Sequence, residues 1–319
     1  MKKFNETELR KTSSKLGFLL IFYFLLNVII SIFTLDVAKG FLLGKLNLNI
    51  SENMLVDTVS SISNILLIFV LFFFFYVSKK EISINNIHFV NKKVNILPLI
   101  LIGFLVIEIA DIVTNYAMGI CKFIGVKSTS PEFIVEKTTL GIFLSVINFS
   151  LVPALTEEFI FRGIVLNSVR PYGKTFAIFS SAFLFGLVHG NLEQFVFAFI
   201  TGMFFSYVTL LTESLLPSVI IHFLNNFMAD ILNIFQDKEN ILTIILIFKS
   251  FVGLLGLACL FYYWLKNISS IRKVFKTKCP KKKFNIAFID KINAFIFNPG
   301  MTLFVLLALF LLYTSFKGK

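Results

Sequence analysis

Nine apolar stretches follow one another along this chain, each close to the about 20 residues that a helix needs to cross a bilayer. They cover residues 16–35, 58–77, 95–118, 140–169, 174–191, 194–212, 214–235, 241–265 and 299–316. Of the 319 side chains, 57% are hydrophobic and only 15% are charged, which leaves too little polar surface for a soluble globule. The sequence therefore predicts an all-α fold, a polytopic transmembrane helical bundle of eight or nine helices that forms a single membrane domain over residues 1–319.

Positive charge is distributed unevenly between the loops. With the N-terminus inside, the loops on the cytoplasmic side hold 21 Lys and Arg residues and those on the opposite side hold 8, as the positive-inside rule requires. The first stretch is long and lacks a small-residue cleavage site, which favours an uncleaved anchor. We expect an integral, multi-pass protein with a cytoplasmic N-terminus, and the abundance of Lys, Asn, Ile and Phe suggests a bacterial plasma membrane.

The net charge of +12 does not indicate nucleic acid as a partner. The positive residues lie in loops that contact anionic lipid, and no nucleic-acid-binding motif accompanies them. Membrane lipid is therefore an expected partner and nucleic acid is not.

Two carboxylates and a guanidinium interrupt the apolar stretch 140–169. Glu158 and Arg162 stand one helical turn apart and can pair, whereas Glu157 is rotated by about 100° and left available. Ionised groups in a membrane are costly and are retained mainly for function. An available carboxylate in an apolar cavity suits a general base that takes a proton from water. The alternative interpretation is an ion pair that joins two helices.

Two histidines and an asparagine occupy the next polar positions within apolar stretches. His189 follows Phe185 by one turn and lies between glycines that allow another backbone or a substrate to approach. His222 and Asn226 also stand one turn apart, so they share a helix face from which Asn225 is expected to point away. A His and an Asn side by side can donate hydrogen bonds to an oxyanion.

These clusters are expected to lie at similar depth. If Tyr172 is at the turn of an antiparallel hairpin, Glu157 precedes it by 15 residues and His189 follows it by 17. At 1.5 Å per residue these separations are roughly 22 and 26 Å, so the two side chains can meet in one cavity. His222 lies about ten residues into its own stretch, again within the membrane.

A further polar stripe, Glu108, Asp111 and Asn115, lies on one face of the stretch 95–118. Two intramembrane acidic residues need a partner. They can line the cavity, receive a proton, bind a cation or make structural hydrogen bonds, and the sequence does not choose between these roles.

Three motifs occur in a fixed order on three predicted helices: Glu157-Glu158-x-x-x-Arg162, Phe185-x-x-x-His189 and His222-x-x-x-Asn226. This order resembles the CPBP family, which includes type II CAAX prenyl endopeptidases, their bacterial relatives and bacteriocin self-immunity proteins. The resemblance covers about residues 140–230, and we expect a catalytic core over 140–235. The other helices are similar only in being hydrophobic.

The resemblance implies an intramembrane endopeptidase that cleaves a membrane-associated peptide or protein substrate. Glu157 would activate the attacking water, with His189 assisting or orienting it. His222 and Asn226 would stabilise the oxyanion. Glu158 would pair with Arg162 and so hold the helix that carries both residues.

Metal dependence stays open at this point. Glu157, His189 and His222 can supply a His₂Glu zinc set with water in the fourth position. The same side chains can also work without a divalent cation, and we favour this metal-free mechanism.

Two alternatives differ in class from a protease. A non-catalytic bacteriocin immunity or membrane-scaffold protein would keep its effect without Glu157. A transporter would use Glu108, Asp111 and the histidines as an ion path, although no inverted repeat supports this. The substrate's identity and whether it is prenylated, its side of entry and the oligomeric state are not in the sequence.

Overall fold

The structure is a computed structural model. It describes residues 6–36, 58–66, 89, 95–128, 135, 137–276 and 288–317. The second half of the predicted helix 58–77, most of the loops 36–57 and 78–94, and residues 277–287 of the Lys-rich segment lie outside these residues.

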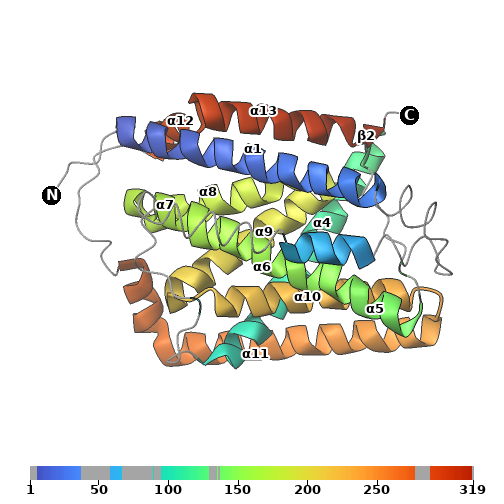
Figure 1. The fold of residues 1–319 in the computed structure, drawn as a ribbon. Helices are drawn as coiled ribbons and strands as arrows, with labels where there is room; N and C mark the ends of the chain where they lie inside the picture. Colours follow the sequence, from blue (N-terminus) through green and yellow to red (C-terminus); the bar gives the residue numbers. More distant parts are fainter. Residues whose placement is uncertain are drawn as a thin grey trace.

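Helices make up almost all of the described chain (Figure 1). The longer ones are α1 (Glu6–Asp36), α4 (Ile96–Phe123), α8 (Lys174–Leu187), α9 (Leu192–Thr212), α10 (Leu216–Ile234), α11 (Glu239–Lys276), α12 (Phe288–Ile296) and α13 (Pro299–Thr314). Two strands of two residues, β1 (Lys127–Ser128) and β2 (Phe316–Lys317), pair antiparallel. The predicted all-α fold is confirmed.

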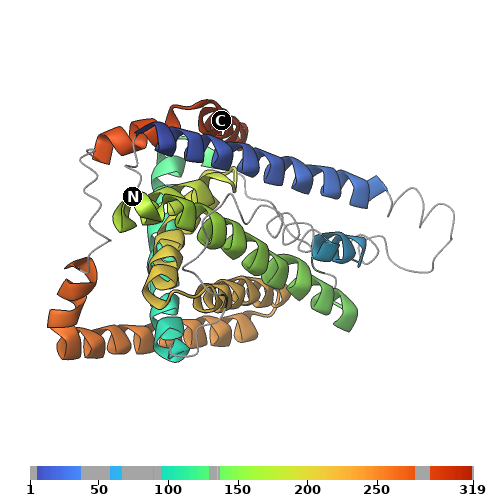
Figure 2. The same ribbon diagram turned by 60° about the vertical axis from the view of Figure 1, so that its left-hand side comes forward.

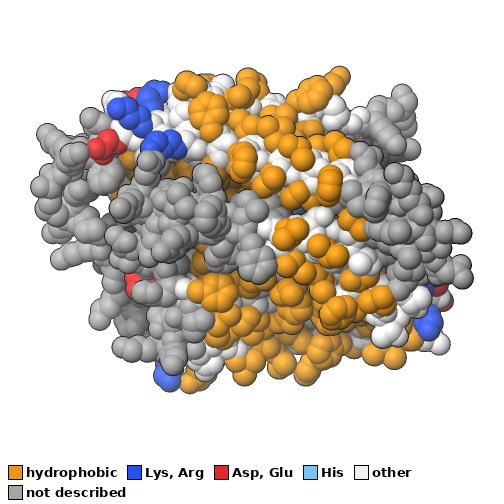
Figure 3. Space-filling model, in the orientation of Figure 1, with side chains coloured by type: hydrophobic (Ala, Val, Ile, Leu, Met, Phe, Trp, Pro, Cys, Tyr) orange, Lys and Arg blue, Asp and Glu red, His pale blue; other side chains and the backbone are white. Residues whose placement is uncertain are grey.

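Hydrophobic side chains cover much of the outer surface. Figure 3 shows a broad apolar band on one face, with Lys, Arg, Asp and Glu gathered toward its two ends. Within the described residues, five helical segments are long and apolar enough to cross a membrane: Glu6–Ile30, Ile96–Phe123, Thr139–Tyr172, Leu192–Thr212 and Glu239–Lys266. A sixth is α12 with α13, bent by 82°. The chain is an integral membrane protein, and the predicted count of eight or nine also includes α8, α10 and the partly described helix from residue 58.

The segment 139–172 is not the regular α-helix that the sequence predicts. It alternates between α-helical α5 (Thr139–Ser145), α6 (Val152–Glu158) and α7 (Asn167–Val169), π-helical η2 (Val146–Leu151) and η3 (Phe159–Leu166), and the 3₁₀ turn η4 (Arg170–Tyr172). Pro153 lies at the start of α6 and has no N–H for an α-helical hydrogen bond, which fits the wider turn before it. Such π-turns are frequent at functional sites.

The predicted hairpin after this segment is present. Gly173 ends η4 with a φ of 130°, a conformation that favours glycine, and α8 then returns along η3. The hydroxyl of Ser181 donates a 2.8 Å hydrogen bond to the Phe161 carbonyl, which fixes the two helices side by side.

Close backbone approaches hold the outer helices in place. A Cβ on Gly17 of α1 would lie 2.2 Å from the carbonyl carbon of Gly300 in α13, and these helices pack against each other (Figure 1). A Cβ on Gly256 of α11 would lie 2.1 Å from the Leu101 oxygen in α4. In Figure 2, α4 stands across α11 and reaches from it toward α1 and α13. Thus α4 joins the two outer layers and passes the candidate site.

Candidate active site

Glu158 and Arg162 form an ion pair in the interior. The Nη1 of Arg162 donates to Oε1 of Glu158 at 2.9 Å, and both side chains are fully buried. The guanidinium lies 4.2 Å from the centre of the Phe185 ring, and its Nη2 donates to the Gly202 carbonyl at 3.3 Å. The predicted pair therefore exists, and it links η3 to both α8 and α9.

His222 of α10 is attached to the same carboxylate. Its Nδ1 lies 3.0 Å from Oε1 of Glu158. A carboxylate accepts, so this nitrogen carries the hydrogen. The imidazole stacks on Phe205 at 5.5 Å between ring centres, and Phe185 meets it edge-on at 5.8 Å. Glu158 thus fixes the orientation of the His222 ring.

Glu157 lies on the other side of this imidazole. Its Oε2 is 3.8 Å from Nε2 of His222, and 18% of its side chain is exposed. This separation is too long for a direct hydrogen bond. The structure therefore brings Glu157 next to one of the two imidazoles, as the common depth of the clusters predicts.

The hydrogen bond of His189 determines which of its ring nitrogens carries the hydrogen. Its Nδ1 lies 2.8 Å from the Phe185 carbonyl, which can only accept, so Nδ1 carries the hydrogen. In the neutral ring the lone pair is then on Nε2. The Phe185 ring contacts both imidazoles, at 5.1 Å from His189 and 5.8 Å from His222. Phe185 is therefore the apolar spacer between the two histidines.

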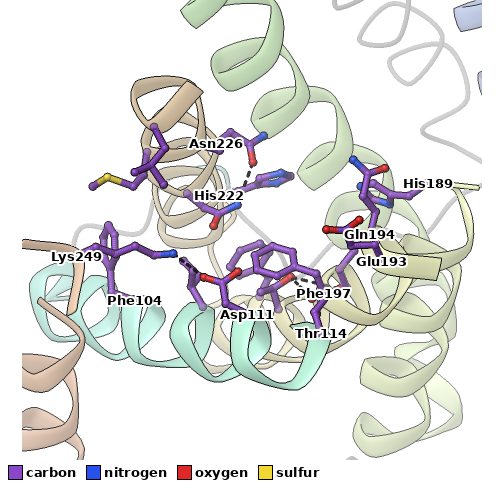
Figure 4. A pocket seen from close by; sticks show the side chains of 18 of the residues that line it. Phe104, Asp111, Thr114, His189, Glu193, Gln194, Phe197, His222, Asn226 and Lys249 are labelled. Atoms are coloured by element: carbon purple, nitrogen blue, oxygen red, sulfur yellow. Dashed lines mark hydrogen bonds and ion pairs between the residues drawn. The ribbon is translucent and has the colours of Figure 1, made fainter. Parts of the chain in front are cut away.

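A cavity of about 390 Å³ joins these side chains (Figure 4). His189, His222, Asn225 and Asn226 line it, together with residues of α4, α9 and α11. Glu157 is not among the lining residues and lies beside it through its contact with His222. Of the six predicted site residues, His189, His222 and Asn226 line this cavity. The other three, Glu157, Glu158 and Arg162, do not line it.

The expected direction of Asn225 is wrong. Asn225 lines the cavity, and its Nδ2 donates to Oδ1 of Asn226 at 3.1 Å. Successive helical residues are about 100° apart, and the two amides bridge that angle because each side chain is long enough to bend toward the other. The bond occupies the Asn226 oxygen and leaves its Nδ2 as a donor.

Comparison with known proteins identifies the segment that carries these groups. Residues 139–228 match the family model Rce1-like, described as type II CAAX prenyl endopeptidase Rce1-like. Residues 139–228 are therefore called the Rce1-like segment. The match confirms the resemblance predicted from the three motifs. Neither a curated protein nor a solved structure matches the chain significantly.

The Rce1-like segment does not contain the whole cavity wall. Asp111 and Thr114 come from α4 and Lys249 comes from α11, both outside residues 139–228. The Nζ of Lys249 lies 2.5 Å from Asp111 and 3.8 Å from Glu108. Lys249 is therefore the partner that the acidic stripe needs, and it lies inside the predicted stretch 241–265.

Tyr23 and Glu193 lie near the site but belong to none of the three sequence motifs. Tyr23 of α1 is buried beside Thr156 and Glu157, and Glu193 in the first turn of α9 lines the cavity. Tyrosine is common near membrane interfaces and a glutamate in a first helical turn is ordinary. Neither position carried a signal that sequence alone could separate from background.

A zinc set of Glu157, His189 and His222 does not fit this arrangement. Both Nδ1 atoms donate to oxygen acceptors and leave Nε2 available, a pattern that metal-binding histidines also show, so these hydrogen bonds do not decide the question. Across the described ranges, no three His, Cys, Asp or Glu side chains form a group that could hold a metal ion. The chemistry below is therefore derived from the side chains themselves.

Proposed function

We propose that this chain is an intramembrane endopeptidase that hydrolyses a peptide bond of a membrane-associated peptide or protein. One observation carries the proposal: the imidazoles of His189 and His222 line one cavity, and Glu157 lies 3.8 Å from the second of them. The Rce1-like match over residues 139–228 supports the same activity.

In the proposed reaction, Glu157 is the general base. A water beside Nε2 of His222 gives a proton to the Glu157 carboxylate, and its oxygen attacks the carbonyl carbon of the scissile bond. His189, with its Nδ1 held by Phe185, orients this water through Nε2. Protonated Glu157 then delivers the proton to the leaving amine, so the carboxylate is restored.

Asn226 and His222 stabilise the tetrahedral oxyanion in this scheme. The Oδ1 of Asn226 accepts from Nδ2 of Asn225, and the Nδ2 of Asn226 is the donor to the oxyanion. When His222 is protonated, Nδ1–H remains bonded to Glu158 and Nε2–H is available to the oxyanion. Glu158 and Arg162 are positioning residues, because they hold the His222 ring and do not line the cavity.

We further propose that residues 140–235 are the catalytic core of a single membrane domain. The distribution of 21 against 8 basic residues favours a cytoplasmic N-terminus, in a bacterial plasma membrane.

The test uses purified full-length protein and a library of membrane peptides, with cleavage products identified by mass spectrometry. Wild-type protein is expected to cleave, a strong chelator is expected to have no effect, and Glu157→Ala is expected to lower the rate by about 10²–10⁴-fold. Glu239→Ala, at the exposed start of α11, is the control and should keep full activity. Equal rates for Glu157→Ala and wild type would overturn the proposal, and chelator-sensitive cleavage would overturn the metal-free mechanism.

A further inference from the structure

Gln194 lines the cavity that the two imidazoles share (Figure 4). It is the third residue of α9 and belongs to none of the three sequence motifs. Building on the proposed function, we propose that its side-chain Nε2 donates a hydrogen bond to a backbone carbonyl of the bound peptide, next to the scissile bond. Gln194 is then a substrate-binding residue, distinct from the base and from the oxyanion donors.

The hydrogen bonds of Asn191 determine which end of the Gln194 amide remains available. The backbone N–H of Gln194 can only donate, and it lies 2.9 Å from one amide atom of Asn191, which is therefore Oδ1. The other amide atom of Asn191 is then Nδ2, which can only donate, and it lies 2.6 Å from the Gln194 side chain. The contacted atom of Gln194 is therefore Oε1, and Nε2 keeps both of its hydrogens for other acceptors.

This Nε2 is available to a molecule inside the cavity. The Gln194 side chain is half-buried, and no described residue accepts a hydrogen bond from its Nε2. An amide nitrogen with two hydrogens and no acceptor suits a ligand that offers a carbonyl oxygen. The peptide backbone is such a ligand at every residue.

Asn191 also connects this amide with His189. Its Nδ2 donates to the His189 carbonyl at 3.2 Å, so one nitrogen holds the backbone of His189 and the side chain of Gln194. Gly190, with a φ of 67°, allows the chain to turn between α8 and α9. The His189 ring is itself held by the Phe185 carbonyl. The donor of Gln194 therefore has a defined position relative to the imidazole that orients the water.

A peptide in this cavity needs a donor beside the scissile bond. A peptide that lies extended across the cavity has backbone carbonyls without helical partners. An unpaired carbonyl away from water is strongly unfavourable. In the proposed reaction, His222 and Asn226 serve the scissile carbonyl only. Nε2 of Gln194 provides a hydrogen bond to a neighbouring carbonyl.

A purely structural role would use the opposite end of this amide. Asn191 is the N-cap of α9, and a Gln three residues after an N-cap commonly completes a capping box. That role needs only Oε1, as the acceptor for Asn191. A glutamate would accept the same bond, and its negative charge stabilises the first turn of a helix. Capping and substrate binding therefore predict opposite results for Gln194→Glu.

The first test compares Gln194→Glu with Gln194→Met in purified full-length protein, on a peptide that wild type cleaves. Both variants lose the Nε2 donor, whereas only Gln194→Met loses the bond to Asn191. In both we expect KM to rise about 3- to 10-fold with kcat almost unchanged, because a bond to a flanking carbonyl exists before and during the reaction. Gln236→Glu, at the other glutamine of the chain, is exposed after α10 and should match wild type.

Two results of this comparison would overturn the proposal. Wild-type kinetics in Gln194→Glu, with loss only in Gln194→Met, would identify Gln194 as a cap. A fall in kcat with unchanged KM in both variants would assign Nε2 to the scissile oxyanion and not to a flanking carbonyl.

Changes in the peptide locate the accepting carbonyl. Each peptide bond beside the cut is replaced in turn by an (E)-alkene, which keeps the shape of the backbone and removes the oxygen. With wild type, one replacement should raise KM about 3- to 10-fold more than it does with Gln194→Met, because the variant has already lost the donor. Equal effects on both proteins at every position would contradict the proposed bond.

A binding experiment separates this proposal from hydrolysis. Immobilised full-length Glu157→Gln is incubated with a library of membrane-spanning peptides in nanodiscs, and retained peptides are quantified by mass spectrometry. Retention that is about 3- to 10-fold lower in Glu157→Gln/Gln194→Met supports the binding role even if wild type cleaves no peptide. Cleavage by wild type with equal retention by both variants overturns the binding role and leaves the proposed function intact. Retention by neither variant also overturns the binding role.

Discussion

One carboxylate oxygen of Glu158 lies 3.0 Å from Nδ1 of His222. The same oxygen accepts from Arg162 at 2.9 Å, so a single atom connects a histidine of α10 with a guanidinium of η3. The orientation of His222 therefore depends on a buried ion pair that does not itself line the cavity.

Neutralising Glu158 should destabilise the protein strongly. Glu158→Gln leaves the Arg162 guanidinium buried without its counter-ion, and we expect a loss of about 3–5 kcal/mol in the free energy of unfolding. Glu6 and Arg10 offer a matched control, because they form the same i,i+4 pair at 2.8 Å on the exposed surface of α1. Glu6→Gln should cost less than about 1 kcal/mol. Unfolding in detergent micelles measures both, and equal losses would contradict the role given to burial.

Adding one methyl group at Gly202 should disturb the same pair from α9. A Cβ there would lie 2.9 Å from Phe185 and 3.2 Å from Nη2 of Arg162. We expect Gly202→Ala to lower stability by about 1–3 kcal/mol through overpacking, and to slow cleavage because His222 loses its support.

Gly119 of α4 provides the comparison, since no atom lies within 4 Å of a Cβ built there. Gly119→Ala should be neutral or stabilise by up to about 1 kcal/mol through helix propensity. Thermal unfolding of the two variants side by side measures the difference, and a loss at Gly119 as large as that at Gly202 would refute the packing argument.

Removing the hydroxyl of Tyr23 should affect the rate more than stability. This tyrosine is buried, and its O–H interacts with Thr156, which directly precedes the proposed base in the chain. We expect Tyr23→Phe to lower kcat about tenfold, less than loss of the base itself, with KM unchanged. Tyr116→Phe, on the exposed face of α4, should behave as wild type. An unchanged kcat in Tyr23→Phe would remove Tyr23 from the site.

The two adjacent asparagines should differ in their effect on turnover. If Nδ2 of Asn226 donates to the oxyanion, Asn226→Ala should lower kcat about 10²–10³-fold. Asn225→Ala frees the Asn226 oxygen and removes only its orientation, so a smaller loss is expected. Steady-state kinetics on one cleaved peptide distinguishes them. A greater loss at Asn225 than at Asn226 would reverse the roles.

Local spacing was enough to predict several features of the site. Residues four apart share a helix face, which is why the Glu158–Arg162 pair was predicted correctly. The hairpin at Tyr172 and the comparable depth of Glu157 and the imidazoles follow from helix rise alone. The order of the three motifs predicted the family that the match to residues 139–228 confirms.

Contacts between helices that are distant in the chain could not be predicted from the sequence. Glu108 and Asp111 clearly needed a cation, but the choice of Lys249 depends on how α4 crosses α11. The contribution of Tyr23 depends likewise on where α1 packs. Asn225 was misplaced because a helical wheel gives the direction of a Cβ and says nothing about how a longer side chain bends.

The number of residues in the two π-helical stretches sets the direction in which the carboxylates of Glu157 and Glu158 point. A π-turn holds one residue more than an α-turn, and η2 and η3 flank the short helix that carries Glu157 and Glu158. Deleting a single residue from either flank would allow ordinary winding and swing the neighbouring part of the helix by about 100°. Insertions and deletions between Thr139 and Tyr172 are therefore expected to turn the carboxylates away from His222.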